Sequence, residues 1–245
     1  MLQSFIQSFL SYFGLRVVRY PSQQMEDLNK ILSFFDISLI IDVGANIGQF
    51  TTYVRNCGFS KKIISFEPLE REFQLLQKKH STDKYWGALN MAVGDFDGEA
   101  YINRAENSFS SSILEVKQDF TNNDFKSVGI KPLDKQFINV IKLDTFFKDN
   151  QIDSRENIFL KIDVQGFEKK VIDGGSKSLQ FIKAIQLEMS IEKVYEGGIS
   201  FEEMLSLLSS YGFKLIYIIP GFCNPKTGQM IEFDGIFLNS NLTKL

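Results

Sequence analysis

Apolar runs recur along the chain and alternate with helical patterns. Runs typical of β-strands lie at residues 39–43, 62–66, 86–93, 137–143, 158–163, 183–189, 213–219 and 231–238. Between many of them, apolar residues at helical spacing predict helices at about 24–35, 48–57, 69–80, 167–174 and 200–211. Strands that alternate with helices indicate βαβ units and a mainly parallel sheet with helices on both faces.

The end of the chain departs from this alternation. The segments "GFKLIYIIPGF" and "MIEFDGIFLN" have the pattern of two strands, and the turn "NPKTG" joins them without a helix. Strands joined so closely are antiparallel, because a parallel crossover needs about a dozen residues or more. We therefore expect an α/β fold whose parallel sheet ends in an antiparallel hairpin.

No repeat, low-complexity tract or linker divides the chain, so we expect a single domain over residues 1–245. About the first 35 residues form a helical extension, in which "MLQSFIQSFLSYFGLRVVRY" has the spacing of an amphipathic helix. With so few basic residues, packing on the domain is favoured over binding to a membrane or a partner, although both stay open. The polar, irregular region 104–136 predicts an insertion or flap at the active site.

Composition narrows the functional class. The net charge of −3 gives no electrostatic argument for a nucleic-acid partner. Cys57 and Cys223 are far apart and are expected to be free thiols in a reducing compartment, which indicates a cytoplasmic protein. No apolar run reaches the roughly 18 residues that a membrane span requires. The oligomeric state is not predicted.

The stretch "LIIDVGANIGQF" carries the first chemical signal, because an apolar strand ends in Asp42 and turns through Gly44 and Gly48. Ligands of open α/β sheets bind beyond the carboxyl ends of the strands, and glycines let the backbone approach them closely. The spacing G-x-x-x-G differs from the G-x-G-x-x-G of dinucleotide sites, and an acid at this turn favours a cationic ligand over a pyrophosphate. The next strand ends in Glu67, where a carboxylate can bind both hydroxyls of a ribose. A ribose, a cationic end and no phosphates together indicate S-adenosylmethionine.

A second acidic cluster follows later in the chain. In "IFLKIDVQGFEKKVIDGG" the strand contains Lys161 and ends in Asp163, and Glu168 lies in the first turn of the next helix. Glu188 ends the strand "AIQLE". Carboxylates at one sheet edge repel one another unless the site uses them, although Glu168 can simply favour the helix dipole and Glu188 can be solvated. We expect a function for Asp163 and Glu188 and leave both interpretations open for Glu168.

If the methyl group of S-adenosylmethionine is transferred to an alcohol, the reaction requires a base within hydrogen-bond reach of the hydroxyl. The only histidine, His80, lies at the polar end of a helix away from the strand ends, so we expect it to be a solvated or capping residue. The catalytic candidates are therefore Glu188 and Asp163, followed by Glu168. A Mg²⁺ ion held by the same acids, which would acidify the hydroxyl, is an alternative that the sequence leaves open.

The motifs "IDVGANIGQFT", "SFEP", "NMAVGD", "LKIDVQGFEKKVIDGG" and "IQLEMS…YEGG", in this order, resemble the FkbM-type S-adenosylmethionine-dependent methyltransferases. The resemblance runs from about residue 25 to 240, and the ending "TGQMIEFDGIFLN" shares it. It implies a class I methyltransferase fold, Rossmann-like, with a mostly parallel seven-stranded sheet and an antiparallel last strand. It also implies methylation of a hydroxyl on a small-molecule or glycan acceptor such as a sugar, a glycan or a polyketide-like product.

The resemblance implies roles for individual residues. The methionine part of the cofactor would be lined by the turn residues Asp42, Gly44, Ala45, Asn46 and Gly48. Glu67 would hold the ribose, Asn90 and Ala92 would border the adenine, and Asp163 would lie near the sulfonium. The serine-rich segment 108–112, with Ser110, Ser111 and Ser112, matches a loop over the acceptor pocket, although a flexible polar loop explains it equally well. Gln165 departs from the family, which often has glutamate there, so a direct role for this position is in doubt.

Two other classes of protein remain as alternatives. A nicotinamide-dependent oxidoreductase on a related fold is disfavoured, because the G-x-G-x-x-G motif is missing and the tail is antiparallel. A non-catalytic binding module is disfavoured, because acids stand at the ends of four predicted strands.

Overall fold

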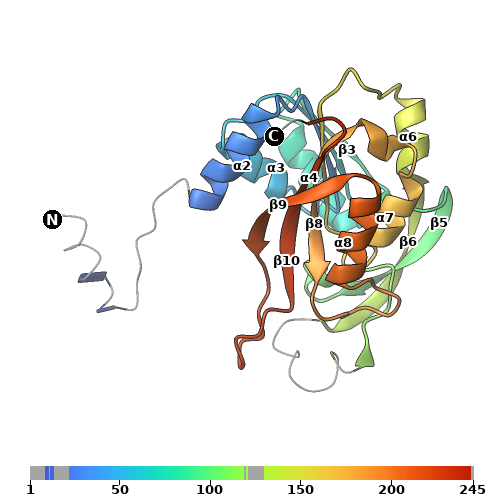
Figure 1. Cartoon of the computed structure of the whole chain (residues 1–245). Helices are drawn as coiled ribbons and strands as arrows, with labels where there is room; N and C mark the ends of the chain where they lie inside the picture. Colours follow the sequence, from blue (N-terminus) through green and yellow to red (C-terminus); the bar gives the residue numbers. More distant parts are fainter. Residues whose placement is uncertain (1–8, 11, 14–21, 119, 121–129, 244–245) are drawn as a thin grey trace.

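A seven-stranded sheet forms the centre of the protein (Figure 1). The computed structural model describes residues 9–10, 12–13, 22–118, 120 and 130–243. The strands of this sheet are β1 (Leu39–Val43), β2 (Lys62–Phe66), β3 (Trp86–Leu89), β7 (Ile158–Ile162), β8 (Ile182–Ser190), β9 (Phe213–Pro220) and β10 (Glu232–Asn239). Their order is β3-β2-β1-β7-β8-β10-β9, and β10 pairs antiparallel with both of its neighbours while the pairs from β3 to β8 are parallel. The predicted α/β fold with an antiparallel last strand is confirmed.

Helices cover both faces of this sheet. They are α2 (Gln23–Phe34), α3 (Gln49–Asn56), α4 (Glu70–His80), α6 (Leu143–Asp149), α7 (Glu168–Gly174) and α8 (Phe201–Ser210). Leu28, Val54 and Leu76 of the first three helices share a core cluster with Ile40 and Phe159 of the sheet. Side chains of α6, α7 and α8 pack with the opposite face of the same strands. The five predicted helices are confirmed, and α6 is an additional one.

A smaller sheet has the strand order β4-β6-β5, and because of it two predicted strands were partly wrong. Its strands are β4 (Ala92–Gly94), β5 (Gly98–Ala105) and β6 (Pro132–Lys142). The run 86–93 is therefore two strands in different sheets, and it divides at Asn90, whose Nδ2 donates to the backbone oxygens of Glu67 and Pro68. The run 137–143 belongs to β6, which pairs with β5 and β4 and not with the large sheet. Within the described residues, short 3₁₀ helices lie at η1 (Ser108–Ser110) and η3 (Ser178–Phe181).

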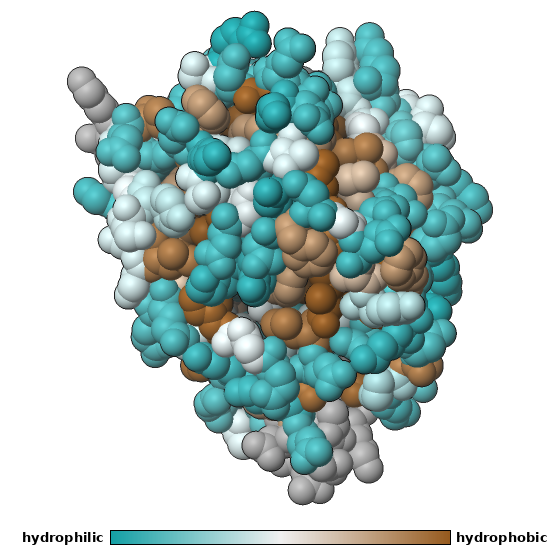
Figure 2. Space-filling model, turned by 90° about the vertical axis from the view of Figure 1, so that its right-hand side faces the viewer, coloured by the Kyte–Doolittle hydropathy of each residue, from teal (hydrophilic) through white to brown (hydrophobic). Residues whose placement is uncertain are grey.

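The surface is mixed in polarity. Figure 2 shows hydrophobic side chains among hydrophilic ones on the right-hand side of Figure 1, where β5 and β6 lie. Tyr101 of β5 and Phe137 of β6 are exposed, and their ring centroids are 5.4 Å apart. In the part of the chain that the structure describes, every helix is too short or too polar to cross a bilayer. Most of the predicted N-terminal amphipathic helix lies outside the described residues.

Candidate functional site

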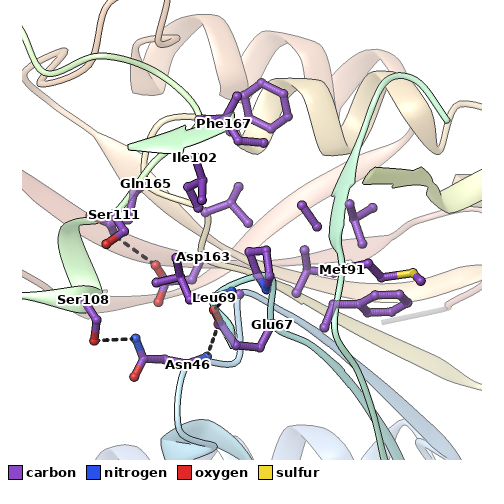
Figure 3. Close-up of a pocket in the computed structure, with 18 of the residues that line it drawn as sticks. Asn46, Glu67, Leu69, Met91, Ile102, Ser108, Ser111, Asp163, Gln165 and Phe167 are labelled. Carbon is purple, nitrogen blue, oxygen red and sulfur yellow. Dashed lines mark hydrogen bonds between the residues drawn. The ribbon is translucent and has the colours of Figure 1, made fainter. Parts of the chain in front are cut away.

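A cavity opens at the carboxyl ends of β1, β2 and β7 (Figure 3). Its lining includes Gly44, Asn46, Glu67, Ala92 and Asp163. Gly44 and Asn46 follow β1, Glu67 follows β2 and Asp163 follows β7, so the parallel strands bring them to one edge of the large sheet, whereas Ala92 begins β4 of the small sheet. We name this space the first cavity.

The turn after β1 approaches the end of β7 very closely. Gly44 has φ +82°, and an added Cβ would lie 1.8 Å from the backbone oxygen of Asp163. Only glycine fits this position, because both the backbone conformation and the missing space exclude a side chain. Gly48 has φ +79° but faces Trp86, where an added Cβ would lie 2.6 Å from the indole. Gly48 and the buried Ala45 therefore shape the turn from within the core and lie outside the lining of the cavity.

Glu67 joins the turns that follow β1 and β2. Its Oε2 accepts a hydrogen bond from the backbone N–H of Asn46 at 2.7 Å, and its Oε1 accepts one from that of Leu69 at 2.8 Å. The side chain is 4% exposed, and this burial raises its pKa to about 7, although the two hydrogen bonds favour the charged form. Each carboxylate oxygen has a second lone pair, so Glu67 retains acceptor capacity at the wall of the cavity.

Asp42 lies below the cavity and outside its lining. Its side chain is fully buried, and its Oδ2 accepts weak hydrogen bonds from Ser65 at 3.3 Å and Thr51 at 3.4 Å. Among the described residues, Oδ1 has no hydrogen-bond donor, and the Nζ of Lys161 is 3.9 Å away. Burial raises the pKa of Asp42, and the charge of Lys161 opposes that rise. The side chain of Asp42 therefore interacts with Lys161 and is not exposed to the first cavity.

Lys161 holds Asp163 in its charged form. Its Nζ lies 2.9 Å from Asp163 Oδ2, and the side chain of Lys161 is 9% exposed. Burial opposes ionisation of Asp163, but the charge and hydrogen bond of Lys161 outweigh it and keep the pKa below the usual value. Lys161 itself stays protonated, because Asp163 and Asp42 overcome its desolvation and raise its pKa. Asp163 therefore presents a stable negative charge to the cavity.

A second cavity adjoins the first, and Asp163, Gln165 and Phe109 line both. Its lining also contains the two carboxyl groups of Glu188 and Glu232. Burial raises the pKa of Glu188 well above its usual value, and the charge of Asp163 adds to the rise. Burial also raises the pKa of Glu232 to about 7. A raised pKa makes the ionised carboxylate a stronger base, as proton removal by a general base requires.

Glu168, the third candidate acid, lies outside both linings. Its side chain is 3% exposed, and its Oε1 accepts hydrogen bonds from the backbone N–H groups of Val164 at 3.1 Å and Gly166 at 3.2 Å. Burial raises its pKa to about 7. This geometry holds the turn between β7 and α7, and it leaves Glu168 without access to a bound molecule.

The serine-rich segment forms part of both walls. Ser108 and Ser111 line the first cavity, and Ser110 lines the second. Ser108 Oγ accepts a hydrogen bond from Asn46 Nδ2 at 3.1 Å, which ties the segment to the turn after β1 (Figure 3). Ser112 is buried, and its Oγ donates to the backbone oxygen of Gln165 at 2.6 Å. Ser111 and Ser112 therefore fasten the segment, whereas Ser110 faces the second cavity.

Of the three residues of the motif "NMAVGD" that the sequence places at this edge, Met91 and Ala92 line the first cavity, whereas Asn90 fastens the backbone. Two titratable lining residues were not among the sequence candidates. Tyr195 and Glu232 line the second cavity. The motif "YEGG" contains Tyr195, but its position against Gly166 follows from the fold alone. His80 lies at the end of α4, with its ring centroid 6.4 Å from that of Trp86 and outside both cavities.

The described residues contain no group of three or more histidine, cysteine, aspartate or glutamate side chains arranged to hold a metal ion. The two described cysteines, Cys57 and Cys223, are free. The geometry of the described acids therefore does not support the Mg²⁺ alternative.

The fold is that of class I methyltransferases. Its mainly parallel sheet has their strand order, an antiparallel strand is inserted next to one edge, and a glycine turn follows the central strand. Residues 42–215 match the model of the FkbM methyltransferase domain, and the chain belongs to this family. It is 26% identical over 206 residues to Methyltransferase 1 of Beauveria bassiana (strain ARSEF 2860), and the match covers 80% of each chain.

Two solved structures show more distant similarity. The methyltransferase FkbM from Methylobacillus flagellatus KT is 15% identical with a TM-score of 0.44, over 82% of this chain and 44% of that one. The chain thus spans less than half the length of that protein. An rRNA methylase from Streptococcus thermophilus is 11% identical with a TM-score of 0.47, over 92% of this chain and 99% of that one. These similarities are too low to indicate a substrate.

Proposed function

We propose that this protein transfers a methyl group from S-adenosylmethionine to a hydroxyl oxygen of a small-molecule or glycan acceptor. The observation that carries the proposal is the pair of adjoining cavities that meet at Asp163 and Gln165. The first cavity lies beside the glycine turn after β1. The second is lined by Glu188 and Glu232, whose pKa values are raised. Such a pair suits a cofactor and an acceptor that must meet end to end.

The first cavity fits the proposed cofactor. Gly44 lets the turn after β1 pack directly against the backbone of Asp163, where an added Cβ would lie 1.8 Å from the oxygen, and this brings the turn and Asp163 to the same wall of the cavity. Glu67 would accept the ribose hydroxyls, Met91 and Ala92 would border the adenine, and the ionised Asp163 would favour a cation. When bound, S-adenosylmethionine supplies a methyl group already activated by its sulfonium. The protein then has to align the acceptor and exclude water, which can lower the barrier by several kcal/mol.

The second cavity would hold the acceptor. Its walls include the aromatic rings of Phe109, Tyr195 and Phe222, which suit the apolar faces of a sugar or a polyketide-like molecule. Among its described lining residues, the charged side chains are all carboxylic acids. A neutral or cationic acceptor therefore fits better than a phosphorylated or carboxylated one, and a nucleic-acid acceptor would meet the same repulsion.

Glu188 is the proposed base. Asp163 is a weaker base, because Lys161 stabilises its charged form, and Glu168 is occupied by backbone N–H groups. Burial and the charge of Asp163 raise the pKa of Glu188, which makes its ionised form the stronger base, and Glu188 lines the proposed acceptor cavity. The metal alternative is not needed for this role.

Thermal unfolding with added ligand tests the proposal. A ligand at 100 times its dissociation constant stabilises the native state by about 2.7 kcal/mol, so S-adenosylmethionine and S-adenosylhomocysteine should both raise Tm. NAD⁺ should not, because the turn offers an acidic edge and no phosphate-binding glycine pattern. Gly44→Ala, whose added Cβ would force the turn away from the backbone of Asp163, should abolish the shift in any fraction that folds. Stabilisation by NAD⁺ with none by either adenosyl ligand would contradict the proposal.

A further inference from the structure

Gln165 occupies the boundary between the two cavities in a strained conformation. It has φ +55°, which is uncommon for any residue other than glycine, and Gly166 follows with φ +90°. Such a conformation persists only where surrounding contacts fix it. Here Ser112 Oγ donates to the backbone oxygen of Gln165 at 2.6 Å, and Tyr195 packs so closely that an added Cβ on Gly166 would lie 2.8 Å from it. The backbone is held from both sides.

The side-chain amide of Gln165 connects two carboxyl groups. Its Nε2 donates to Asp163 Oδ1 at 3.0 Å and to Glu188 Oε2 at 3.1 Å. Asp163 lines both cavities, whereas Glu188 lines only the second. Both hydrogens of one amide nitrogen are therefore used on two acids that belong to different sides of the site.

Tyr195 fixes which way the amide points. Its hydroxyl lies 3.0 Å from Gln165 Oε1 and 3.2 Å from the backbone oxygen of Ser110, and it donates towards both. A flipped amide would turn its oxygen to the two carboxyl groups and lose both donated bonds. Tyr195 is 4% exposed, so water does not easily replace these contacts. The amide orientation is thus set by the protein before any ligand binds.

The geometry points to Gln165 as a positioning residue that couples the two cavities, so that a cation bound beside Asp163 favours loss of the proton from Glu188. This inference rests on the proposed function and deepens it, because it links the charge of the cofactor to the readiness of the base. A glutamate at position 165 would instead place a third acid between Asp163 and Glu188 and repel both.

The charged surroundings of Glu188 make it responsive to such a ligand. The titratable groups that interact with it are Asp163 after β7, Glu168 of α7, Glu232 and Asp234 of β10, and Tyr195. The carboxylates disfavour ionisation of Glu188, and the amide hydrogen bond from Gln165 favours it. A positive charge added on the Asp163 side shifts this balance towards the ionised form.

Calorimetric titrations in two buffers of different ionisation enthalpy count the protons released on binding. The probes are S-adenosylmethionine, which carries the sulfonium charge, and S-adenosylhomocysteine, which lacks it. We expect the wild-type protein to release more protons with the first ligand than with the second around neutral pH. Gln165→Met keeps the length of the side chain but removes the donors, so the pH of greatest release should move upward by about 0.5–1 unit.

Two further variants separate coupling from structure. Tyr195→Phe removes only the oxygen that orients the amide, and it should shift the release profile in the same direction by a smaller amount. Gln180→Met, a matched change at an exposed glutamine whose Nε2 donates to Lys177 O, should leave the profile unchanged. If Gln165→Met does not fold, the Tyr195→Phe profile decides the question.

The outcomes distinguish this inference from the proposed function. Equal proton release for both ligands, or the same profile in wild type, Gln165→Met and Tyr195→Phe, would overturn the coupling while leaving the cofactor assignment intact. A wild-type protein that binds neither ligand would overturn the proposed function and the coupling with it.

Discussion

Replacing Lys161 by methionine should destabilise the protein strongly, because this cation compensates two acids. Its Nζ is 2.9 Å from Asp163 and 3.9 Å from Asp42, and Asp42 is fully buried. Removing one partner of a buried ion pair costs about 3–5 kcal/mol, since the remaining charge stays uncompensated. Asp163 is 39% exposed, so water screens part of its charge. We therefore expect a loss of about 3 kcal/mol, at the lower end of that range.

Urea unfolding followed by circular dichroism measures this loss. The matched control is Lys170→Met, because Lys170 pairs with Asp95 at 2.7 Å on the surface, where ion pairs contribute less than about 1 kcal/mol. Without Lys161 the folded-state pKa of Asp42 rises further above its unfolded value of about 3.9. A raised folded pKa gives stability that is lost as pH rises, so the deficit should be larger at pH 8 than at pH 5.5. A deficit equal to that of the control, or equal at both pH values, would refute this reasoning.

Three further outcomes are expected. Glu67→Ala should weaken S-adenosylmethionine binding by about 1–3 kcal/mol in calorimetry and leave the fold intact, and unchanged affinity would remove Glu67 from the site. Gly44→Ala should lower the free energy of unfolding more than the control Gly197→Ala, because Gly197 has a similar φ but open space around it. The control should cost about 1–2 kcal/mol, and equal losses would mean that Gly44 has room for a Cβ. Glu188→Gln should lower turnover roughly 10²–10⁴-fold with little change in cofactor affinity, and wild-type turnover should rise with pH as Glu188 ionises. His80→Ala should remain active, and an inactive His80 variant beside an active Glu188 variant would exclude Glu188 as the base.

Much of the large sheet could be predicted from the sequence, because its central strands are short apolar runs with clear ends. The small sheet could not. Its strand β5 (Gly98–Ala105) is polar and half exposed, so it lacks the apolar signal of a buried strand. A single polar residue, Asn90, interrupts the run 86–93, and its side-chain hydrogen bonds mark the point where the chain leaves the large sheet. A local pattern does not contain that contact.

The candidate site was predictable at the strand ends and less so elsewhere. Asp163 and Glu67 directly follow strands, and parallel topology brings such ends together. Asp42 lies one residue before the end of β1, and its buried side chain is on the face that packs with α3, where Thr51 lies 3.4 Å from it. Tyr195 and Gln165 meet through a turn and a loop, and their hydrogen bond depends on a strained backbone that sequence spacing does not reveal.

A crystal structure of the protein with S-adenosylhomocysteine tests the central claim most directly. The account predicts the ligand in the first cavity, with its ribose hydroxyls on Glu67 and its sulfur beside Asp163, facing Glu188 across the amide of Gln165. Density for the ligand elsewhere, or a ribose that does not touch Glu67, would contradict the assignment of this cavity to the methyl donor.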